Sequence, residues 1–290
     1  MIDTSKKFLV AGAGKSGIGS VNLLLKTGAD VSLYDGKEDL EKEALYEKLY
    51  EKKEIPLILG NITKEDIEKY DLLVLSPGIS VNAPIAQMFY DQEKPVWSEI
   101  ELAYQASKGK IAAITGTNGK TTTTALTGQI VGAWAKKTFV VGNIGNSYTK
   151  EVLNSDEDSY TVAEISSFQL ETVHKFAPKV SAVLNITPDH LNRHYTMECY
   201  TDVKMSIAKN QDSNQPIVLN YEDPILREYA GKLTNRIIWF SSKQKVNPGV
   251  YLEGKNIIYA DGKKETFVTT TEDTTPVSYT HLRAHETLRH

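Results

Sequence analysis

The feature that most constrains the fold is a short apolar segment that runs directly into a glycine-rich loop and then into helix-forming residues. Residues 111–114 form the apolar segment, Gly116-Thr-Asn-Gly-Lys-Thr121 is the loop, and residues 122–136 have helical spacing. Such a junction points consecutive backbone N–H groups and the positive end of a helix dipole at one spot. Lys120 suits the outer phosphates of a nucleotide, and the Thr121 hydroxyl suits its Mg²⁺. The sequence therefore predicts a phosphate-binding loop in a P-loop-type α/β ATPase domain.

This loop departs from the usual pattern G-x-x-x-x-G-K-[ST], because Ile114 stands where that pattern has its first glycine. A simple glycine turn with a solvated Lys120 is the alternative interpretation. The strand expected before the loop and the helix expected after it favour phosphate binding. The residues expected to bind ATP are Gly116, Thr117, Asn118, Gly119, Lys120, Thr121 and Thr122.

A second glycine loop lies near the amino terminus. Residues 8–11 are apolar, Gly12-Ala-Gly-Lys-Ser-Gly17 matches G-x-G-x-x-G, and Asp35 follows the next predicted strand at 31–34. This arrangement is typical of dinucleotide-binding loops with a ribose-binding acid, so an NAD-binding oxidoreductase is one hypothesis. Glycines that only permit close packing of helix on strand are the other. No pattern for hydride transfer accompanies the loop, and an oxidoreductase does not need the second loop at 116–121.

Alternating strand and helix patterns predict two α/β units. In the first unit, strands at 57–59 and 72–75, a helix at 16–26 and a highly charged helix at 38–53 indicate a Rossmann-like, doubly wound parallel sheet. In the second unit we expect strands at 139–141, 160–163, 180–184 and 237–240, and a hairpin around Gly254 and Asp261-Gly262. Polar residues 91–94 suggest the linker, which gives domains at 1–93 and 94–276. Residues 277–290 resemble translated sequencing adapter and are excluded from fold reasoning.

Composition limits the partners of the chain. Its 290 residues carry a net charge of −4, which provides no basic footprint for nucleic acid. The single cysteine, Cys199, excludes a disulfide framework and a cysteine-cluster zinc site. No stretch reads as a signal peptide or as a membrane-spanning helix. We therefore expect a cytoplasmic protein without membrane insertion.

Polar residues also follow two later strands. Glu164 ends one strand and begins Glu164-Ile-Ser-Ser-Phe-Gln-Leu170, and His190 ends the segment Asn185-Ile-Thr-Pro-Asp-His190 after another. The carboxyl ends of parallel strands share one sheet edge, so both side chains are expected near the phosphate loop, with Glu164 suited to bind Mg²⁺. The alternatives are an exposed Glu164 beside a helix cap and a structural or solvated His190. Lys204 would ordinarily be a helix-surface lysine.

In order and spacing, these motifs resemble the Mur ligase family. The resemblance rests on Gly116–Thr121, Gly142-Asn-Ile-Gly145, Glu164–Leu170 and Asn185-x-x-x-Asp-His190, and it extends from about residue 7 to 270. Ser-Phe-Gln after Glu164, Asn192-Arg193 and Trp97–Leu102 are similar to the family's D-glutamate-adding members. Other Mur-type or folylpolyglutamate-type ligases remain an alternative, although the latter typically read Gly-Lys-Gly-Ser where this chain has Gly-Lys-Thr-Thr.

The resemblance implies an ATP-dependent ligase that adds D-glutamate to UDP-N-acetylmuramoyl-L-alanine through an acyl phosphate. That reaction serves peptidoglycan synthesis, and hence cell shape and division. The implied uridine-nucleotide site contains Gly12, Gly14, Lys15, Ser16, Gly17, Asp35, Ser76, Pro77 and Gly78. The implied catalytic residues are Lys120, Asn143, His190 and Lys204. The implied ligands of two Mg²⁺ ions are Thr121, Glu164, His190 and Lys204, the last as its carbamate.

The same resemblance implies a further domain that binds the incoming amino acid and closes over the site. The sequence up to residue 290 has no match to that domain. We therefore expect this chain alone to form no amide bond, and a non-catalytic nucleotide-binding fragment is the third hypothesis. The full-length protein is expected to be monomeric.

Overall fold

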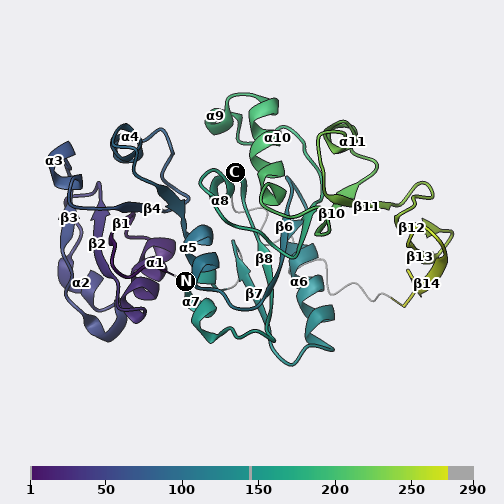
Figure 1. Ribbon diagram of the computed structural model, residues 1–290, viewed down its shortest axis with the longest axis horizontal. Helices are drawn as coiled ribbons and strands as arrows, with labels where there is room; N and C mark the ends of the chain where they lie inside the picture. Colours follow the sequence, from purple (N-terminus) through teal and green to yellow (C-terminus); the bar gives the residue numbers. More distant parts are fainter. Residues whose placement is uncertain (1, 144–145, 274–290) are drawn as a thin grey trace.

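Two sheets, one after the other along the chain, organise the molecule (Figure 1). The computed structural model describes residues 2–143 and 146–273. The segment 277–290, excluded above as adapter sequence, and the last two residues of the Gly142–Gly145 motif lie outside the described residues. Both sheets combine parallel strands with flanking helices, so the expected α/β architecture is confirmed.

The first sheet has the strand order β3-β2-β1-β4-β5, and all neighbours pair in parallel. Its strands are β1 (Lys7–Ala11), β2 (Asp30–Asp35), β3 (Leu57–Leu59), β4 (Leu72–Leu75) and β5 (Val96–Ser98). The strand order reverses between β1 and β4, which is where open α/β sheets bind ligands. Because β5 belongs to this sheet, the sheet continues past the linker expected at 91–94.

Strand β1 shows why the sheet is covered on both faces. Phe8 and Val10 pack in one core cluster with residues of α1 (Lys15–Lys26). Leu9 and Ala11 pack in another with Phe89 of α4 (Pro84–Asp91). Successive side chains of a strand point to opposite faces, so a run of apolar residues needs helices on both sides.

The prediction of one charged helix at 38–53 is wrong. Only α2 (Lys42–Tyr46) and a 3₁₀ turn, η1 (Tyr50–Lys52), form there, and Glu51 has φ 55°. Leu45 and Leu49 are buried, but the residues around them are charged and do not extend these two leucines into a longer apolar stripe. Because a helix in a protein depends on burying such a stripe, the helical segment stays short. The remaining helix of this domain is α3 (Lys64–Ile67).

The second sheet has the order β14-β13-β12-β11-β10-β9-β6-β8-β7. Pairing is parallel from β7 to β12 and antiparallel for β12-β13 and β13-β14. Its strands are β6 (Lys110–Thr115), β7 (Thr138–Gly142), β8 (Tyr160–Glu164), β9 (Val180–Val183), β10 (Pro216–Asn220), β11 (Arg236–Ser241), β12 (Gly249–Glu253), β13 (Asn256–Ala260) and β14 (Glu265–Thr270). The turns at Gly254 and Asp261-Gly262 thus join three antiparallel strands rather than one hairpin.

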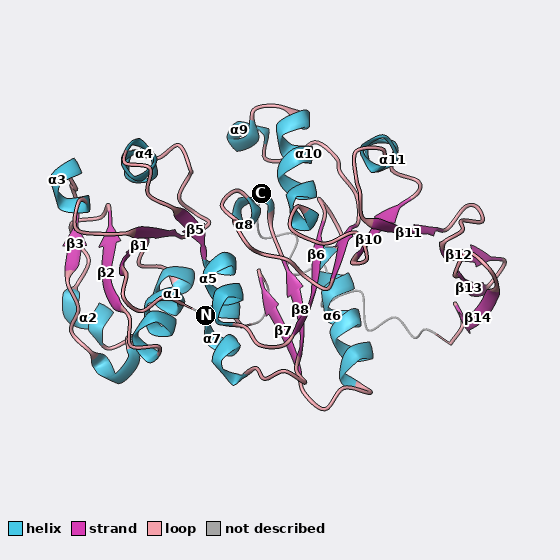
Figure 2. Cartoon of the chain, in the orientation of Figure 1, coloured by secondary structure: helices cyan, strands magenta, loops and turns pink. Residues whose placement is uncertain are grey.

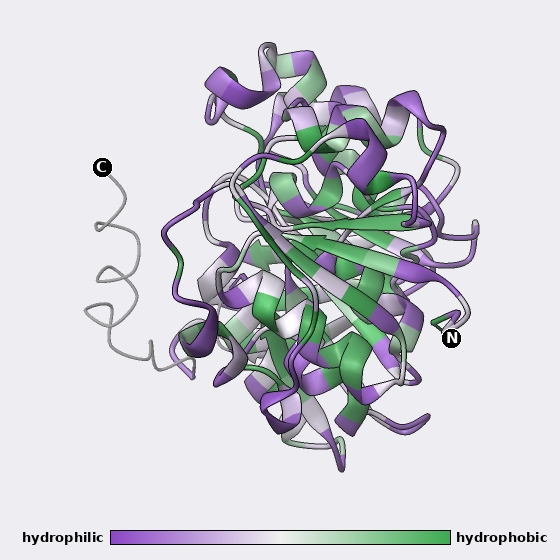
Figure 3. Cartoon of the chain, turned by 90° about the vertical axis from the view of Figure 1, so that its left-hand side faces the viewer, coloured by the Kyte–Doolittle hydropathy of each residue, from purple (hydrophilic) through white to green (hydrophobic). Residues whose placement is uncertain are grey.

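Helices and short helical turns cover this sheet (Figure 2). They are α5 (Glu99–Ala106), α6 (Lys120–Gly132), α7 (Tyr148–Glu151), η2 (Val152–Asn154), α8 (Ser167–Leu170), α9 (Leu191–His194), α10 (Met197–Met205), η3 (Ser206–Ala208) and α11 (Pro224–Ala230). Figure 3 shows strands of mostly hydrophobic residues in the interior and hydrophilic loops around them. The carboxyl ends of β6, β8 and β9 lie side by side, and the candidate site forms there.

Candidate active site

The loop between β6 and α6 is held in shape by two glycines and by the segment after β9. Gly116 has φ 151° and Gly119, the residue before α6, has φ 82°, conformations that favour glycine. Asn185 secures the loop: its backbone carbonyl accepts from Thr117 N at 2.9 Å, and its side-chain oxygen accepts from Asn118 N at 2.8 Å. Some backbone N–H groups of the loop are therefore already hydrogen-bonded within the protein. The N–H groups in the first turn of α6 are the ones suited to bind an anion.

Glu164 lies at the centre of the site. Its side chain is only 1% exposed, at the carboxyl end of β8. Thr121 Oγ1 donates to Glu164 Oε2 at 2.9 Å, and Asn143 Nδ2 donates to Glu164 Oε1 at 2.9 Å. Gly142 permits the close pairing of β7 with β8 at this point, because a Cβ there would lie 2.1 Å from the backbone oxygen of Glu164. The interpretation of Glu164 as an exposed residue beside a helix cap is excluded.

The residues around Glu164 fit a bound cation. Its two side-chain hydrogen-bond partners, a hydroxyl and an amide, are neutral, and its carboxylate oxygens keep lone pairs for a cation. Buried charges are generally paired with an opposite charge or bound to a metal. Across residues 2–143 and 146–273, however, no three His, Cys, Asp or Glu side chains form a cluster able to hold a metal ion. A cation at this site would therefore be held by the carboxylate of Glu164 and the hydroxyl of Thr121.

Lys204 is a buried lysine beneath the phosphate loop. It lies on α10, is 2% exposed, and its Nζ donates to Gly116 O at 2.7 Å. Burial, together with the nearby positive charge of Lys120, lowers the pKa of Lys204 from 10.5 to about 7. Lys120 Nζ donates to Thr117 O at 2.8 Å, so both lysines bind carbonyl groups of the same loop. Lys204 is therefore no ordinary surface lysine.

His190 follows β9 at the same edge of the sheet. Its Nε2 lies 3.4 Å from Asp189 Oδ2, its side chain is 47% exposed, and its ring centroid is 4.8 Å from that of Phe168. Its backbone is left-handed, with φ 51°. Among the described residues, no hydrogen bond joins His190 to Glu164. The structure thus links Thr121, Asn143 and Glu164 directly, and places His190 at the rim.

Sequence reasoning missed two residues that shape this site. Asn185 was noted only as part of a motif, yet it secures the phosphate loop. Tyr200 lies behind that loop: its hydroxyl is 3.2 Å from Thr117 Oγ1, and Lys204 Nζ lies 4.8 Å from its ring centroid. The signal for Asn185 was its position directly after a strand adjacent to the loop. Nothing in the spacing of Tyr200 indicated its role.

The glycine loop of the first domain is also defined by close contacts. Gly12 has φ 100°, and a Cβ on Gly17 would lie 1.7 Å from Gly12 O, so both glycines are required for packing of α1 on β1. At Gly14 the space is open. Asp35 accepts from Ala13 N at 2.8 Å and from Lys37 N at 3.0 Å. Asp35 therefore shapes this loop, and its carboxylate oxygens keep lone pairs for a ligand.

The other residues expected to bind the uridine nucleotide surround this loop. Lys15 and Ser16 begin α1, where Lys15 is exposed and Ser16 half-buried. Ser76, Pro77 and Gly78 follow β4, the strand beside β1, and Ser76 N donates to Ala11 O at 3.1 Å. Both loops therefore lie at the same switch point of the first sheet.

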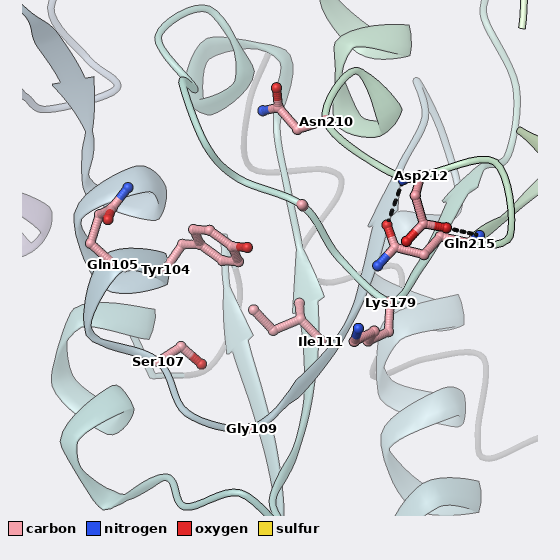
Figure 4. Close-up of a pocket in the computed structure, with 10 residues that line it drawn as sticks. Tyr104, Gln105, Ser107, Gly109, Ile111, Lys179, Asn210, Asp212 and Gln215 are labelled. Carbon is pink, nitrogen blue, oxygen red and sulfur yellow. Dashed lines mark hydrogen bonds between the residues drawn. The ribbon is translucent and has the colours of Figure 1, made fainter. Parts of the chain in front are cut away.

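A hollow of about 430 Å³ lies at the opposite ends of the central strands (Figure 4). Ile111 near the start of β6, Lys179 just before β9 and Gln215 just before β10 line it. It is therefore at the amino ends of these strands, away from Glu164 and the phosphate loop.

In the described part of the chain, no helix is both long and apolar enough to cross a membrane.

Comparisons with known proteins match both halves of the chain. The family described as "Mur ligase MurD-like, N-terminal domain" matches residues 6–98, and "Mur ligase middle domain" matches residues 114–285. The second match therefore runs into the segment excluded above as adapter sequence.

Two curated relatives extend this comparison. A UDP-N-acetylmuramoylalanine--D-glutamate ligase of Lachnospira eligens is 56% identical over 261 residues, which are 90% of this chain and 58% of the relative. One of Lachnoclostridium phytofermentans is 50% identical over 263 residues, which are 91% of this chain and 58% of the relative. The chain thus spans 58% of the length of these relatives.

A solved structure shows the same fold at low identity. It is a UDP-N-acetylmuramate:L-alanyl-gamma-D-glutamyl-meso-diaminopimelate ligase from Neisseria meningitides. The TM-score is 0.54 at 16% identity, and the alignment covers 89% of this chain and 85% of that one.

Proposed function

Since this chain belongs to the Mur ligase family, we propose that it is the nucleotide-binding part of an ATP-dependent ligase. The proposed reaction joins D-glutamate to UDP-N-acetylmuramoyl-L-alanine in the cytoplasmic synthesis of peptidoglycan precursors. The observation that carries the proposal is the buried Glu164, bonded to Thr121 at the head of the phosphate loop and to Asn143. The 56% identity to a ligase named for this reaction supports the choice of substrates. The complete protein is proposed to act as a monomer.

The charges of the site suit phosphoryl transfer to a carboxylate. The carboxylate of UDP-N-acetylmuramoyl-L-alanine would take the γ-phosphoryl group of ATP and release ADP, and the amino group of D-glutamate would then displace phosphate to form the amide. Attack of one anion on another requires positive charge at the approach. Lys120 would offset the phosphate charge, and Asn143 would orient the substrate carboxylate. Mg²⁺ ions held by Thr121, Glu164, His190 and carbamylated Lys204 would add charge neutralisation.

Binding measurements on the chain test this proposal. We expect ADP to bind more tightly with Mg²⁺ than without it, and Glu164→Gln to remove the gain from Mg²⁺ while metal-free ADP still binds. Exposed Glu157→Gln is the matched control and should retain the gain. We also expect UDP-N-acetylmuramoyl-L-alanine to bind and NAD to show no binding. Calorimetry that found NAD bound and the uridine nucleotide unbound would contradict the proposal and restore the oxidoreductase hypothesis.

The carbamate on Lys204 has its own test. A neutral lysine amine adds to CO₂ to form the carbamate and release one proton, and the lowered pKa of Lys204 provides the neutral amine near pH 7. With ¹³C-labelled bicarbonate, we expect a carbamate signal by ¹³C NMR that disappears in Lys204→Met. Lys209→Met is the control, because Lys209 is also partly buried and its pKa is also lowered by burial. A signal that persisted in Lys204→Met would refute the assignment.

A further inference from the structure

Arg193, the third residue of the four-residue helix α9, lies between the two domains with most of its hydrogen-bond donors engaged. Its Nε donates to Glu171 Oε1 at 3.0 Å and its Nη2 to Glu171 Oε2 at 2.5 Å, which is the bidentate arrangement typical of arginine with carboxylate. The guanidinium carbon lies 4.0 Å from the ring centroid of Phe168. The side chains of Arg193 and Glu171 are 12% and 7% exposed, so the ion pair is largely shielded from water.

The same guanidinium also binds the first domain. Nη1 donates to Pro77 O at 2.7 Å and Nη2 to Ile79 O at 3.0 Å. These carbonyls belong to the segment after β4, which includes the candidate uridine-nucleotide residues. Close by, Asn82 Nδ2 donates to Tyr195 OH at 3.2 Å, which adds a second contact between the same two segments.

In the central domain, Arg193 contacts His190 and the segment that follows Glu164. Its backbone N–H donates to His190 O at 2.9 Å, so it is fixed relative to the rim residue His190. Glu171 and Phe168 belong to the segment that follows Glu164. Next to Arg193, the buried His194 lies with Nε2 3.0 Å from Ser167 Oγ, which ties α9 to α8.

We propose that Arg193 is a positioning residue that holds the Ser76–Ile79 segment of the first domain in register with Glu164 and His190 of the second. This inference rests on the proposed function, in which one substrate spans both domains. Such a ligand gains affinity when its two half-sites are already held at the right separation. A ligand that touches one domain gains nothing from the clamp.

Lysine at position 193 distinguishes positioning from general stability. Lys keeps the charge that Glu171 needs but lacks the planar fork that binds a carboxylate and two carbonyls together. In Arg193→Lys we expect the affinity for UDP-N-acetylmuramoyl-L-alanine to fall on the order of tenfold, or about 1.4 kcal/mol, because the two half-sites are no longer held at one separation. The affinities for UDP and for Mg-ADP, each confined to one domain, should change less than twofold.

Arg227→Ala is the matched control. Arg227 also lies over an aromatic ring, 5.4 Å from the ring centroid of Tyr221, but both residues belong to the central domain. This variant should bind all three ligands like the original chain. Equal losses for all three ligands in Arg193→Lys, or no loss for any, would overturn the proposal.

An inter-domain distance tests the clamp without any ligand. Cys199 is exposed and is the only cysteine of the chain, so it accepts one spin label, and exposed Glu68→Cys in the first domain accepts the other. Electron–electron double resonance should give one narrow distribution of the distance between the two labels in the labelled chain with arginine at position 193 and in its Arg227→Ala variant. In the Arg193→Lys variant this distribution should be broadened or shifted. An unchanged distribution would overturn the clamp. A chain that bound no uridine nucleotide but retained this response would refute the proposed function alone.

Discussion

Glu99 provides a sensitive test of how burial controls the charge states of this protein. It lies in the first turn of α5, is 3% exposed, and its Oε1 accepts from Gln169 Nε2 at 2.8 Å. Among the described residues, its Oε2 is buried without a hydrogen-bond partner. Burial raises the pKa of Glu99 from 4.5 to about 7, although the hydrogen bond from Gln169 opposes the shift.

The size and sign of the effect follow from this shift. In the unfolded chain Glu99 loses its proton near pH 4.5, but in the folded protein it keeps the proton until about pH 7. Between these values the folded state binds more protons, so the free energy of unfolding falls as the pH rises through this window. At about 1.4 kcal/mol per pKa unit, the ionised Glu99 costs the folded state roughly 3 kcal/mol above pH 7.

Glu99→Gln removes this cost and keeps an oxygen acceptor for Gln169. At pH 8 we expect the variant to be more stable than the original chain by up to about 3 kcal/mol. At pH 5 the carboxyl is mostly protonated in the folded state, so the two proteins should differ little. Urea denaturation followed by circular dichroism at both pH values measures the difference.

Glu101→Gln is the control, two residues along the same helix. Glu101 is also fully buried, but its carboxylate accepts from the backbone N–H groups of His174, Lys175 and Phe176. In Glu101→Gln, the side-chain NH₂ would face backbone N–H groups, which are also donors. The free energy of unfolding should therefore fall by about 1–3 kcal/mol at both pH values. The reasoning fails if Glu99→Gln gives no added stability at pH 8, or the same gain at pH 5 and pH 8.

Three further substitutions test the packing and electrostatics. Gly17→Ala should lower the stability by about 1–3 kcal/mol, because its Cβ would lie 1.7 Å from Gly12 O, whereas Gly14→Ala should leave the melting temperature nearly unchanged. The pKa of Lys204 falls from 10.5 to about 7 on folding, so the unfolded state binds more protons between these values and stability should rise with pH. Lys204→Met should flatten this rise between pH 7 and 9, as measured by urea midpoints. Ile130 on α6 is 58% exposed, so Ile130→Lys should change the free energy of unfolding by less than about 0.5 kcal/mol, and a larger loss in urea denaturation would refute this.

The sequence predicted those parts of the fold that depend on local pattern. Apolar segments followed by glycine loops correctly located β1 and β6, because a fully buried parallel strand must be apolar on both faces. The position of Glu164 at a strand end also indicated that it would face the phosphate loop. The helix expected at 38–53 failed because charged residues give helix propensity without a face to bury.

Other parts of the site depend on contacts between distant segments, which one sequence does not reveal. The spacing of Asp35 predicts a ribose-binding acid, and it did not reveal that the carboxylate also accepts from Ala13 N and Lys37 N. A short acidic side chain after a strand can bind either a ligand or a neighbouring loop, and spacing alone does not separate these roles. The burial of Lys204 was likewise inaccessible to pattern reasoning, because a lysine within a polar helix is ordinarily exposed.

The segment from Glu164 to Glu171 joins the chemistry to the domain contact. Glu164 binds Thr121 of the phosphate loop, and Gln169, in the helix α8 that follows, binds Glu99 at the start of the second domain. Glu171, directly after that helix, binds Arg193, which reaches the first domain. Because α8 is a single helical turn in a packed interior, a displacement of one of these residues also displaces the others. The arrangement of the two domains and the placement of the buried carboxylate are therefore set by the same few residues.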